Sequence, residues 1–271
     1  MKIAVITGSR AEYGLLFHTM KKIQENKNFK LKLIVTGQHL EKEFGNTFQN
    51  IKRDKINIFK KIKLTNLGNN TSSIVENISY LVSKFAKLFK KSKFDYVVIL
   101  GDRFEVLSAA ISAAYFKIPI IHIHGGEITE SSFDDYNRHA ISKFSSIHFV
   151  SNKIYKNRLI KMGEMPSKIY ISGAAGIEYI KKLKFLKKKE VYKILKLNLN
   201  EKFSFIAFHP SLDKNYLKQL KNLFKVALIN NHQKYVVSMP NLDLNFRYIN
   251  NFIKSFCNKN INFIYKKSFG S

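Results

Sequence analysis

The chain has 271 residues, of which 45% are hydrophobic and 24% are charged, a globular composition that suits about two domains. Its one cysteine, Cys257, excludes an internal disulfide, and no stretch approaches the ~20 apolar residues that a membrane-spanning helix needs. We therefore expect a cytoplasmic protein that has no membrane partner.

The net charge of +28 would suit a polyanionic partner such as nucleic acid. Only six of the 47 basic residues are arginine, however, and surfaces that read nucleic acid favour the planar guanidinium group. The excess charge is also evenly spread, with +14 over residues 1–173 and +14 over residues 174–271. This pattern favours a lysine-rich composition over a dedicated nucleic-acid surface.

The first 173 residues alternate short apolar runs with helical patterns, which predicts a doubly wound parallel sheet of the α/β class. The predicted strands are residues 2–7, 29–36, 56–59, 95–100, 119–123, 147–150 and 169–172. Helices are predicted directly after the strands at 2–7 and 95–100, and at residues 41–50, 71–91, 134–144 and 153–162. In such sheets, ligands bind outside the carboxyl ends of the strands.

A basic helical stretch follows Gly173 and separates this series from a second one that starts at Phe203 with FSFIAFHP. Further strands are predicted at residues 235–239 and 261–265, and helices at residues 217–229 and 246–256. We therefore expect two domains, residues 1–173 and 174–271. The second has 98 residues, which is few for a doubly wound domain.

The turn after the first strand reads GSRAEYG and leads directly into a helix. Its glycine lets the backbone approach a ligand, and a helix N-terminus offers N–H groups to an anion, so Arg10 is a candidate anion contact. The alternative for Arg10 is a solvated turn residue. The turn lacks the GxGxxG pattern, so a nicotinamide cofactor gains no support. His39 follows the second strand, where a ligand contact and a packed or capping role are both open.

Carboxylates follow two neighbouring strands and begin the next helix, at Asp102, Glu127 and Asp134. Because the carboxyl ends of parallel strands meet at one edge of a sheet, these side chains are expected to lie near one another. Clustered carboxylates push their pKa values apart, which gives an acid and a base suited to proton abstraction and return at a carbon. Arg10, Arg103 and Arg138 would balance this charge and hold a phosphorylated leaving group.

Each of these candidates also has a structural alternative. Asp102 could form a local ion pair with Arg103, and Asp134 could cap its helix together with Asp135. His122, His124 and Glu127 carry groups that can bind a metal ion. His122 and His124 share one face of the predicted strand, but a third ligand at suitable geometry to these two is not evident from the sequence. His209 ends the first strand of the second domain, where it could act as an acid or base or serve only in packing.

Several motifs together carry a resemblance that covers essentially the whole chain. They are GSRAEYG, VTGQHLEKEFGNT, ILGDRFEVLSAA, HIHGGEITE, FDDYNRHAISK, FHPSLD and MPNLD. In this order they resemble the hydrolysing UDP-N-acetylglucosamine 2-epimerases of bacterial sialic acid synthesis. The resemblance implies two Rossmann-like doubly wound domains in the glycosyltransferase-B arrangement, with a UDP-sugar substrate between them.

The implied reaction has two stages at C2 of the sugar. Elimination removes the C2 proton and expels UDP, leaving a 2-acetamidoglucal; water then adds at C1 while C2 is reprotonated from the opposite face, giving N-acetylmannosamine. By motif, the acid/base carboxylates would be Asp102, Glu127 and Asp134, and His209 would assist from the second domain. Related non-hydrolysing epimerases carry glutamate at the position of Asp134.

The resemblance also implies nucleotide contacts and partners. Arg10 would contact the nucleotide phosphates, and Asn241 in MPN would lie near the nucleotide. No redox cofactor or obligatory metal is implied, and a complete chain would form a homo-oligomer.

Family members continue past SFGS into a turn and helix that bind uridine diphosphate, so the second domain is expected to be incomplete, with weak UDP affinity and low turnover. Two alternatives stay open: the same chemistry on a UDP-2,4-diacetamido-trideoxyhexose of the legionaminic acid path, and a non-catalytic polyanion-binding protein.

Overall fold

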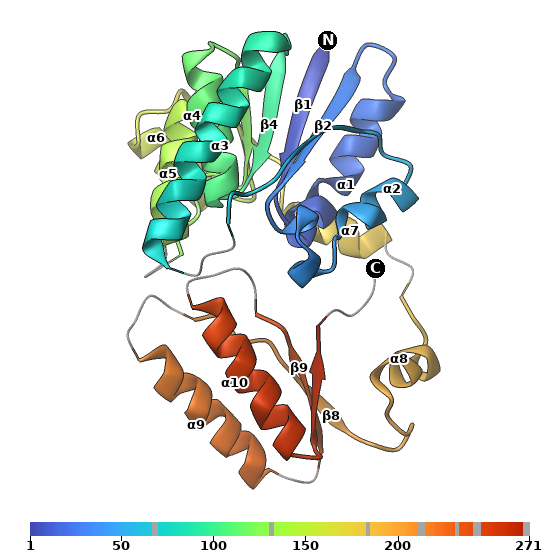
Figure 1. Cartoon of the computed structure of the whole chain (residues 1–271). Coiled ribbons are helices and arrows are strands. Elements are labelled where there is room, and N and C mark those ends of the chain that lie inside the picture. The colour runs from blue at the N-terminus through green and yellow to red at the C-terminus, as the bar shows by residue number, and fades with distance from the viewer. Residues whose placement is uncertain are drawn as a thin grey trace. The chain divides into compact units, whose positions relative to one another are not determined.

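Two compact units, each built on a parallel β-sheet, make up the computed structural model of the chain (Figure 1). The structure describes residues 1–66, 70–129, 133–182, 185–210, 215–230, 233–240 and 245–267. The first unit contains the elements from β1 to α7, and the second contains those from α8 to β10. The α/β class with a parallel sheet in each of two units, predicted from the sequence, is confirmed.

The first unit has a seven-stranded sheet in the order β3-β2-β1-β4-β5-β6-β7, in which all neighbouring strands are parallel. Its strands are β1 (Lys2–Thr7), β2 (Lys30–Thr36), β3 (Ile58–Ile62), β4 (Tyr96–Leu100), β5 (Ile120–Ile123), β6 (Ile147–Val150) and β7 (Ile169–Ile171). The strand order reverses between β1 and β4, so the chain winds in both directions from the centre. A ligand crevice is expected at the carboxyl ends next to this reversal.

Helices cover both faces of this sheet. They are α1 (Arg10–Glu25), α2 (Phe48–Arg53), α3 (Thr71–Lys91), α4 (Phe104–Tyr115), α5 (Phe133–Phe144), α6 (Lys153–Lys161) and α7 (Ala175–Lys182). Figure 1 shows α1, α2 and α7 on one side of the sheet and α3, α4 and α5 on the other. In α4 the small residues Ala109, Ala110 and Ala113 are fully buried, which lets this helix approach its neighbours closely.

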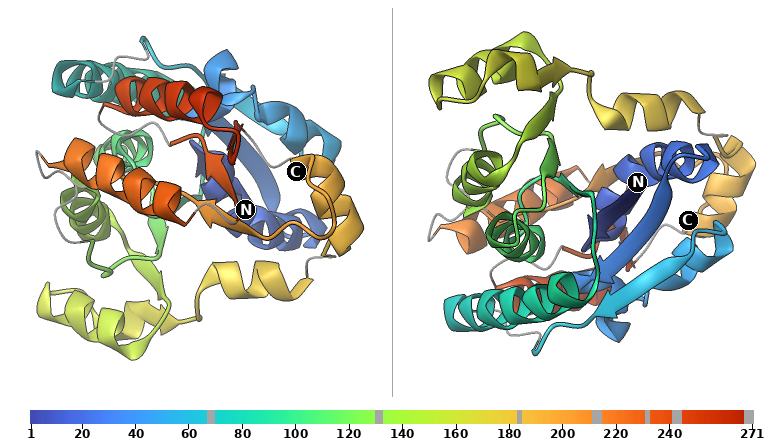
Figure 2. Two further views of the ribbon diagram at one scale, coloured as in Figure 1. Left: turned by 90° about the horizontal axis from the view of Figure 1, so that it is seen from below. Right: turned by 90° about the horizontal axis from the view of Figure 1, so that it is seen from above.

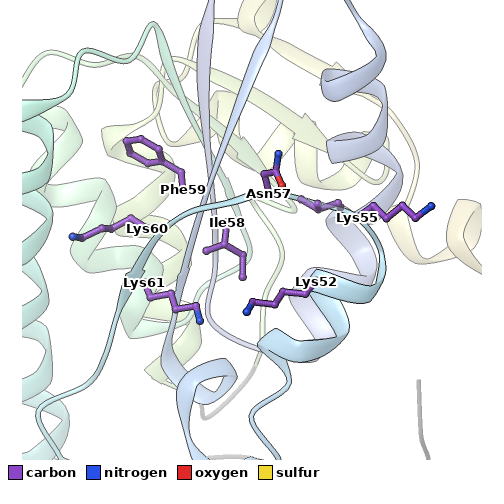
Figure 3. Close-up of a pocket in the computed structure, with 8 residues that line it drawn as sticks. Lys52, Lys55, Asn57, Ile58, Phe59, Lys60 and Lys61 are labelled. Atoms are coloured by element: carbon purple, nitrogen blue, oxygen red, sulfur yellow. The ribbon is translucent and has the colours of Figure 1, made fainter.

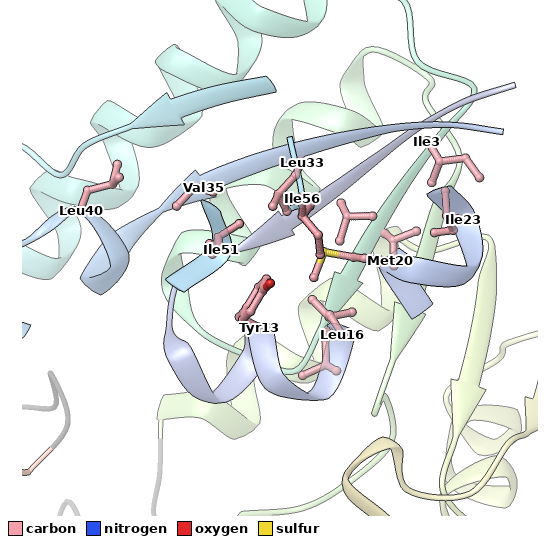
Figure 4. Close-up of a cluster of buried hydrophobic side chains, with 13 residues drawn as sticks. Ile3, Tyr13, Leu16, Met20, Ile23, Leu33, Val35, Leu40, Ile51 and Ile56 are labelled. Atoms are coloured by element: carbon pink, nitrogen blue, oxygen red, sulfur yellow. The ribbon is translucent and has the colours of Figure 1, made fainter. Parts of the chain in front are cut away.

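A buried hydrophobic cluster joins α1 and α2 to the sheet (Figure 4). Leu16 and Met20, one turn apart on α1, and Ile51 of α2 have no solvent exposure and pack with the side chains of β1 and β2. The N-terminus of α1 is fixed by Ser9, whose side chain accepts a hydrogen bond from the Glu12 N–H in a capping box. The turn between β1 and α1 is therefore held firmly.

The predicted helix at residues 41–50 is wrong over most of its length. The structure has two short 3-10 helices there, η1 (Gly37–Leu40) and η2 (Lys42–Phe44), and α2 begins only at Phe48. Gly45 and Asn46 have φ of 85° and 50°, left-handed values that end the short helix and redirect the chain.

The second unit has a three-stranded parallel sheet in the order β10-β9-β8. Its elements are α8 (Lys188–Leu195), β8 (Phe203–Ile206), α9 (Tyr216–Ile229), β9 (Lys234–Ser238), α10 (Phe246–Lys259) and β10 (Phe263–Lys266). The ring of Phe224 on α9 stacks on Phe256 of α10 with centroids 4.5 Å apart, and both rings contact Phe263 of β10 edge-on. Aromatic packing thus joins α9 and α10 to one face of this sheet (Figure 1).

The division between the compact units falls after α7, one helix later than the boundary predicted at residue 173. α7 lies beside α1 (Figure 2), and a Cβ atom added to Gly176 would be 3.2 Å from Leu15 Cδ2. This close approach is a tertiary contact, which the basic composition of the segment could not indicate. None of the helices in the described ranges is both long and apolar enough to cross a membrane.

Candidate active site

The carboxyl ends of β4 and β5 bring two of the candidate carboxylates to one edge of the first sheet. The two strands pair in parallel with Leu100 opposite Ile123, and Asp102 and Glu127 follow two and four residues later. Gly101 turns the chain at the end of β4 with φ of 78°, and its N–H donates to the Ile123 carbonyl at 3.0 Å. The structure therefore places both carboxylates beyond the same strand pair.

Arg138 on α5 links these two strand ends. Its side chain is buried, and one guanidinium nitrogen donates to the Asp102 carboxylate and to Thr129 Oγ1, the latter at 3.1 Å. The other terminal nitrogen donates to the Glu127 carbonyl oxygen at 3.2 Å. Arg138, a candidate for holding a leaving group, thus holds Asp102 and the loop after β5. Asp102 pairs with Arg138 and not with Arg103, so the alternative of a local Asp102–Arg103 pair is wrong.

Glu127 is held by a histidine and a serine. Its Oε1 atom lies 2.7 Å from His124 Nδ1 and accepts a hydrogen bond from Ser151 Oγ at 3.2 Å. Ser151 follows β6 directly, so three consecutive strand ends contribute to this edge. His122 does not join the group, because it is fully buried and its Nε2 donates to the Gly101 carbonyl at 2.8 Å. Burial lowers the pKa of His122 to about 3, which keeps this imidazole neutral.

Asp134 and Asp135 lie in the first turn of α5, the helix that also supplies Arg138. Asp134 is half-buried. Asp135 accepts the Thr129 N–H at 3.1 Å and lies 3.6 Å from a nitrogen of Arg138. Asp135 therefore anchors the loop before α5.

A second charged cluster lies beside this edge, where β1, β2 and β4 end. Arg103 donates to both oxygens of Glu105, at 3.1 and 3.2 Å, and Glu105 is fully buried at the start of α4. Glu12 of α1 accepts the N–H groups of Gly8 and Ser9 at 2.6 and 3.0 Å. Burial raises the pKa of Glu12 to about 7, against the lowering effect of Arg103. Arg103, predicted to hold a leaving group, here balances buried carboxylates.

Sequence reasoning missed Glu12 and Glu105, although both occur in the motifs GSRAEYG and GDRFE. In each motif the glutamate lies on the first turn of a helix that starts directly after a strand. Such a position is favourable for a carboxylate because helix N-termini are positive, and this signal could have identified both residues.

The folding stability of the chain should reflect the buried Glu12 carboxyl. Because its pKa is raised from 4.5 to about 7 in the folded chain, protonation stabilises the fold, and this contribution is complete below pH 4.5 and lost as the pH rises to about 7. We expect the unfolding free energy of the wild type, relative to Glu12→Gln, to fall by on the order of 1.4 kcal/mol per pH unit across this window.

Chemical denaturation at several pH values between 4.5 and 7 measures this difference. Glu25→Gln is the matched control, because it removes a carboxyl from the same helix at a position where the side chain is 62% exposed. For the control, the difference from wild type should not change with pH. If the difference in unfolding free energy between wild type and Glu12→Gln were also independent of pH, the raised pKa of the buried Glu12 carboxyl would be contradicted.

His39 and Arg10 have different environments. His39 is buried, with its two ring nitrogens 3.1 Å from Thr7 Oγ1 and 2.8 Å from Thr47 Oγ1. Burial lowers the pKa of His39 to about 4, so the structure favours the packing role. Arg10 is exposed at the first residue of α1.

Two candidates belong to the second part of the chain. His209 is exposed and follows β8 by three residues. Asn241 lies outside the described residues. The exposure of His209 and Arg10 suits contact with a ligand but does not by itself identify one.

A basic hollow of about 630 Å³ lies against β3, an edge strand of the first sheet (Figure 3). It is lined by Lys52, Lys55, Ile56, Asn57, Ile58, Phe59, Lys60 and Lys61. The ammonium groups of Lys52 and Lys61 lie 5.8 and 3.6 Å from the centre of the Phe48 ring. Partial desolvation and the charges of Lys52 and Lys63 lower the pKa of Lys61. This hollow is three positions from β4 in the strand order and is separate from Asp102.

Comparison with known proteins gives a family with high coverage of this chain. The family model described as UDP-N-acetylglucosamine 2-epimerase matches residues 21–269. A GDP/UDP-N,N'-diacetylbacillosamine 2-epimerase (hydrolyzing) of Campylobacter jejuni is 37% identical, over 96% of this chain and 68% of the relative. The polysialic acid biosynthesis protein P7 of Escherichia coli is 34% identical, over 94% of this chain and 66% of the relative. The chain thus spans about two thirds of the length of these relatives.

Solved structures share the fold. The UDP-GlcNAc 2-epimerase of Neisseria meningitidis bound to UDP-GlcNAc superimposes with a TM-score of 0.80 at 21% identity, covering 99% of this chain and 72% of that one. The UDP-N-acetylglucosamine 2-epimerase of Rickettsia bellii gives 0.79 at 20% identity, covering 100% and 69%. These neighbours have a glycosyltransferase-B-like fold. On the match to the family model and the identity to its relatives, the chain belongs to the UDP-N-acetylglucosamine 2-epimerase family.

Proposed function

We propose that the chain is a hydrolysing 2-epimerase of a UDP-linked 2-acetamido sugar. The observation that carries this proposal is the pair of carboxylates beyond β4 and β5, Asp102 held by Arg138 and Glu127 held by His124 and Ser151. Two carboxylates with different partners at one sheet edge suit a reaction that removes a proton from a carbon and returns one to it. Asp134, at the start of α5, would be a third carboxylate of this group.

The proposed chemistry begins with elimination. A carboxylate takes the proton from C2, the electron pair of that C–H bond forms the C1–C2 double bond, and the C1–O bond breaks to release UDP. Water then adds its oxygen to C1 and gives up one proton to a carboxylate, while a carboxylic acid delivers a proton to C2 on the opposite face. In this scheme Arg10 would contact the departing phosphates, and His209 would assist from the second domain, residues 174–271. Asn241 would lie near the nucleotide.

The names of the relatives support two substrates. The relatives from Campylobacter jejuni and Legionella pneumophila are named for N,N'-diacetylbacillosamine, and the latter is 34% identical to this chain. The relative from Neisseria meningitidis serogroup B, 30% identical, is named for UDP-N-acetylglucosamine. Both sugars carry the acetamido group at C2 and differ at C4 and C6. UDP-diacetylbacillosamine is the first substrate to test, and UDP-N-acetylglucosamine, which would yield N-acetylmannosamine, is the second.

Incubation with each nucleotide sugar in deuterated water, followed by NMR, tests the function. We expect UDP and a free 2-epimerised sugar with deuterium at C2, because the returned proton comes from solvent through a carboxyl group. Release of UDP without deuterium at C2 would contradict the mechanism, and no UDP from either sugar would contradict the function. Salt-sensitive oligonucleotide binding without turnover would favour the polyanion-binding alternative instead.

A further inference from the structure

His124 has an unusual backbone conformation at the end of β5. Its φ is 65°, a left-handed value that a non-glycine residue adopts at a cost in free energy. The residue nevertheless continues the sheet, since its N–H donates to the Phe149 carbonyl at 2.9 Å. The backbone hydrogen bond of His124 therefore fixes the start of the turn. The free-energy cost of the left-handed conformation falls on His124 itself, the residue whose side chain contacts Glu127.

The two glycines that follow His124 let this turn pack closely against neighbouring elements. Gly126 has φ of 75°, and a Cβ atom added to it would lie 2.7 Å from the Tyr155 carbonyl oxygen and 3.0 Å from Leu159 Cγ on α6. A Cβ atom on Gly125 would lie 2.9 Å from Nδ1 of the buried His122 ring. The backbone between His124 and Glu127 is thus packed against neighbouring elements, which sets where both side chains can reach.

The ring of His124 is oriented from both sides. The Ala175 backbone N–H, at the start of α7, points to Nε2 at 3.4 Å. A backbone amide can only donate, so Nε2 accepts and the ring proton lies on Nδ1. That proton is donated to Glu127 Oε1, 2.7 Å away. One tautomer of a neutral imidazole satisfies both contacts.

The carboxylate of Glu127 is therefore fixed through one oxygen. Within the described residues, the hydrogen bonds to this group from His124 Nδ1 and Ser151 Oγ both end on Oε1. These donors carry no charge, in contrast to the guanidinium of Arg138 that pairs with Asp102. Neither of these two hydrogen bonds involves Oε2, the oxygen that would take up the proton in the proposed function.

We propose that His124 is a positioning residue for Glu127: its Nδ1–H fixes Oε1 of the carboxylate, and the Ala175 N–H selects the tautomer that permits this. The role rests on the proposed function, in which Glu127 is one of the acid/base carboxylates. His124 would not touch the reacting atoms. It would hold Glu127 in the one orientation that leaves Oε2 for proton transfer at C2.

Two substitutions separate the side chain of His124 from its backbone. Asn tolerates left-handed φ and places an amide nitrogen close to the position of Nδ1, so His124→Asn keeps both the turn and the donor. Gly adopts the same φ without cost but has no donor, so His124→Gly keeps only the turn. We expect His124→Gly to lower kcat by about 100-fold with little change in KM, because a misplaced catalytic group costs rate more than binding.

The kcat of His124→Asn should lie within about tenfold of the wild-type value. The control is His18→Asn on α1, which removes an imidazole at a position away from Glu127. Equal kcat for the Asn and Gly variants would overturn the proposal, as would a loss confined to KM. Both variants should unfold at temperatures close to the wild type.

A second measurement keeps this inference distinct from the proposed function. Nitrogen-15 NMR of the histidine rings reports the tautomer of His124 whether or not the chain turns over a substrate. We expect the Nδ1–H tautomer in the wild type and a shift of this signal in Glu127→Gln. An Nε2–H tautomer, or a signal that ignores Glu127→Gln, would overturn the proposal even for an active enzyme. Absence of turnover alongside the expected tautomer would contradict the function and leave the pairing established.

Discussion

Replacing Asp102 by Asn is expected to lower kcat by about 10³-fold, because positioned acid/base groups typically contribute 10²- to 10⁴-fold. The side chain keeps its size, but it can no longer take up a proton, and Arg138 loses the nearer of its two carboxylate partners. Release of UDP from the nucleotide sugar measures the rate. Calorimetric titration with UDP measures whether binding survives, and we expect it to change little.

The same substitution should also cost stability, by about 1–3 kcal/mol, because the buried Arg138 guanidinium keeps a hydrogen-bond acceptor but loses a charged one. Thermal unfolding shows whether Asp102→Asn is folded at the assay temperature. Asp135→Asn is the matched control, since it removes a carboxylate 3.6 Å from the same guanidinium. Its kcat should stay within about threefold of wild type. A rate for Asp102→Asn as high as that of the control would sink the assignment of Asp102.

Replacing Gly37 by Ala is expected to destabilise the first unit by about 3 kcal/mol or more, since left-handed strain contributes about 1–2 kcal/mol and overpacking about 1–3 kcal/mol. Gly37 has φ of 59°, and an added Cβ atom would lie 2.5 Å from Glu105 Oε1 and 2.7 Å from the Gly8 carbonyl oxygen. Neither atom can withdraw easily, because Arg103 holds Glu105 and Gly8 lies in the capped turn before α1.

Gly45→Ala separates the two causes. Gly45 also has a left-handed φ, of 85°, but nothing lies within 4 Å of an added Cβ atom, so only the backbone strain of about 1–2 kcal/mol applies. Denaturant unfolding of both variants gives the comparison. If Gly37→Ala proved no more costly than Gly45→Ala, the close packing of β1, β2 and Glu105 would be refuted.

The strands and the carboxylates at their ends could be predicted from the sequence. Short apolar runs and the polar residues directly after them are visible within a few neighbouring positions of the chain. Asp102 and Glu127 could be placed at one edge from strand order alone. Their partners could not be predicted in the same way. Arg138 lies 36 residues after Asp102 and reaches it because α5 packs beside α4 and β5. Arg103, adjacent to Asp102 in sequence, instead points to Glu105.

Two further differences from the sequence-based expectation have separate causes. The predicted helix at residues 41–50 contains hydrophobic residues at helical spacing, but Gly45 and Asn46 take left-handed conformations that a pattern of apolar residues does not reveal. The predicted boundary at residue 173 followed the basic composition, whereas α7 packs on α1 through the contact of Gly176 with Leu15. The first difference is one of local backbone conformation, and the second is a tertiary contact.

The lysines beside β3 have a consequence for the solubility of the protein. An edge strand presents unpaired N–H and C=O groups that can recruit a strand from another molecule, a common route to aggregation. On β3 the exposed residues include Lys60 and Lys61, with Lys52 and Lys55 nearby. A second strand docking there would have to strip water from these ammonium groups. These lysines lie away from the carboxylate site, and their charge protects the open β3 edge of the same sheet from pairing with another molecule.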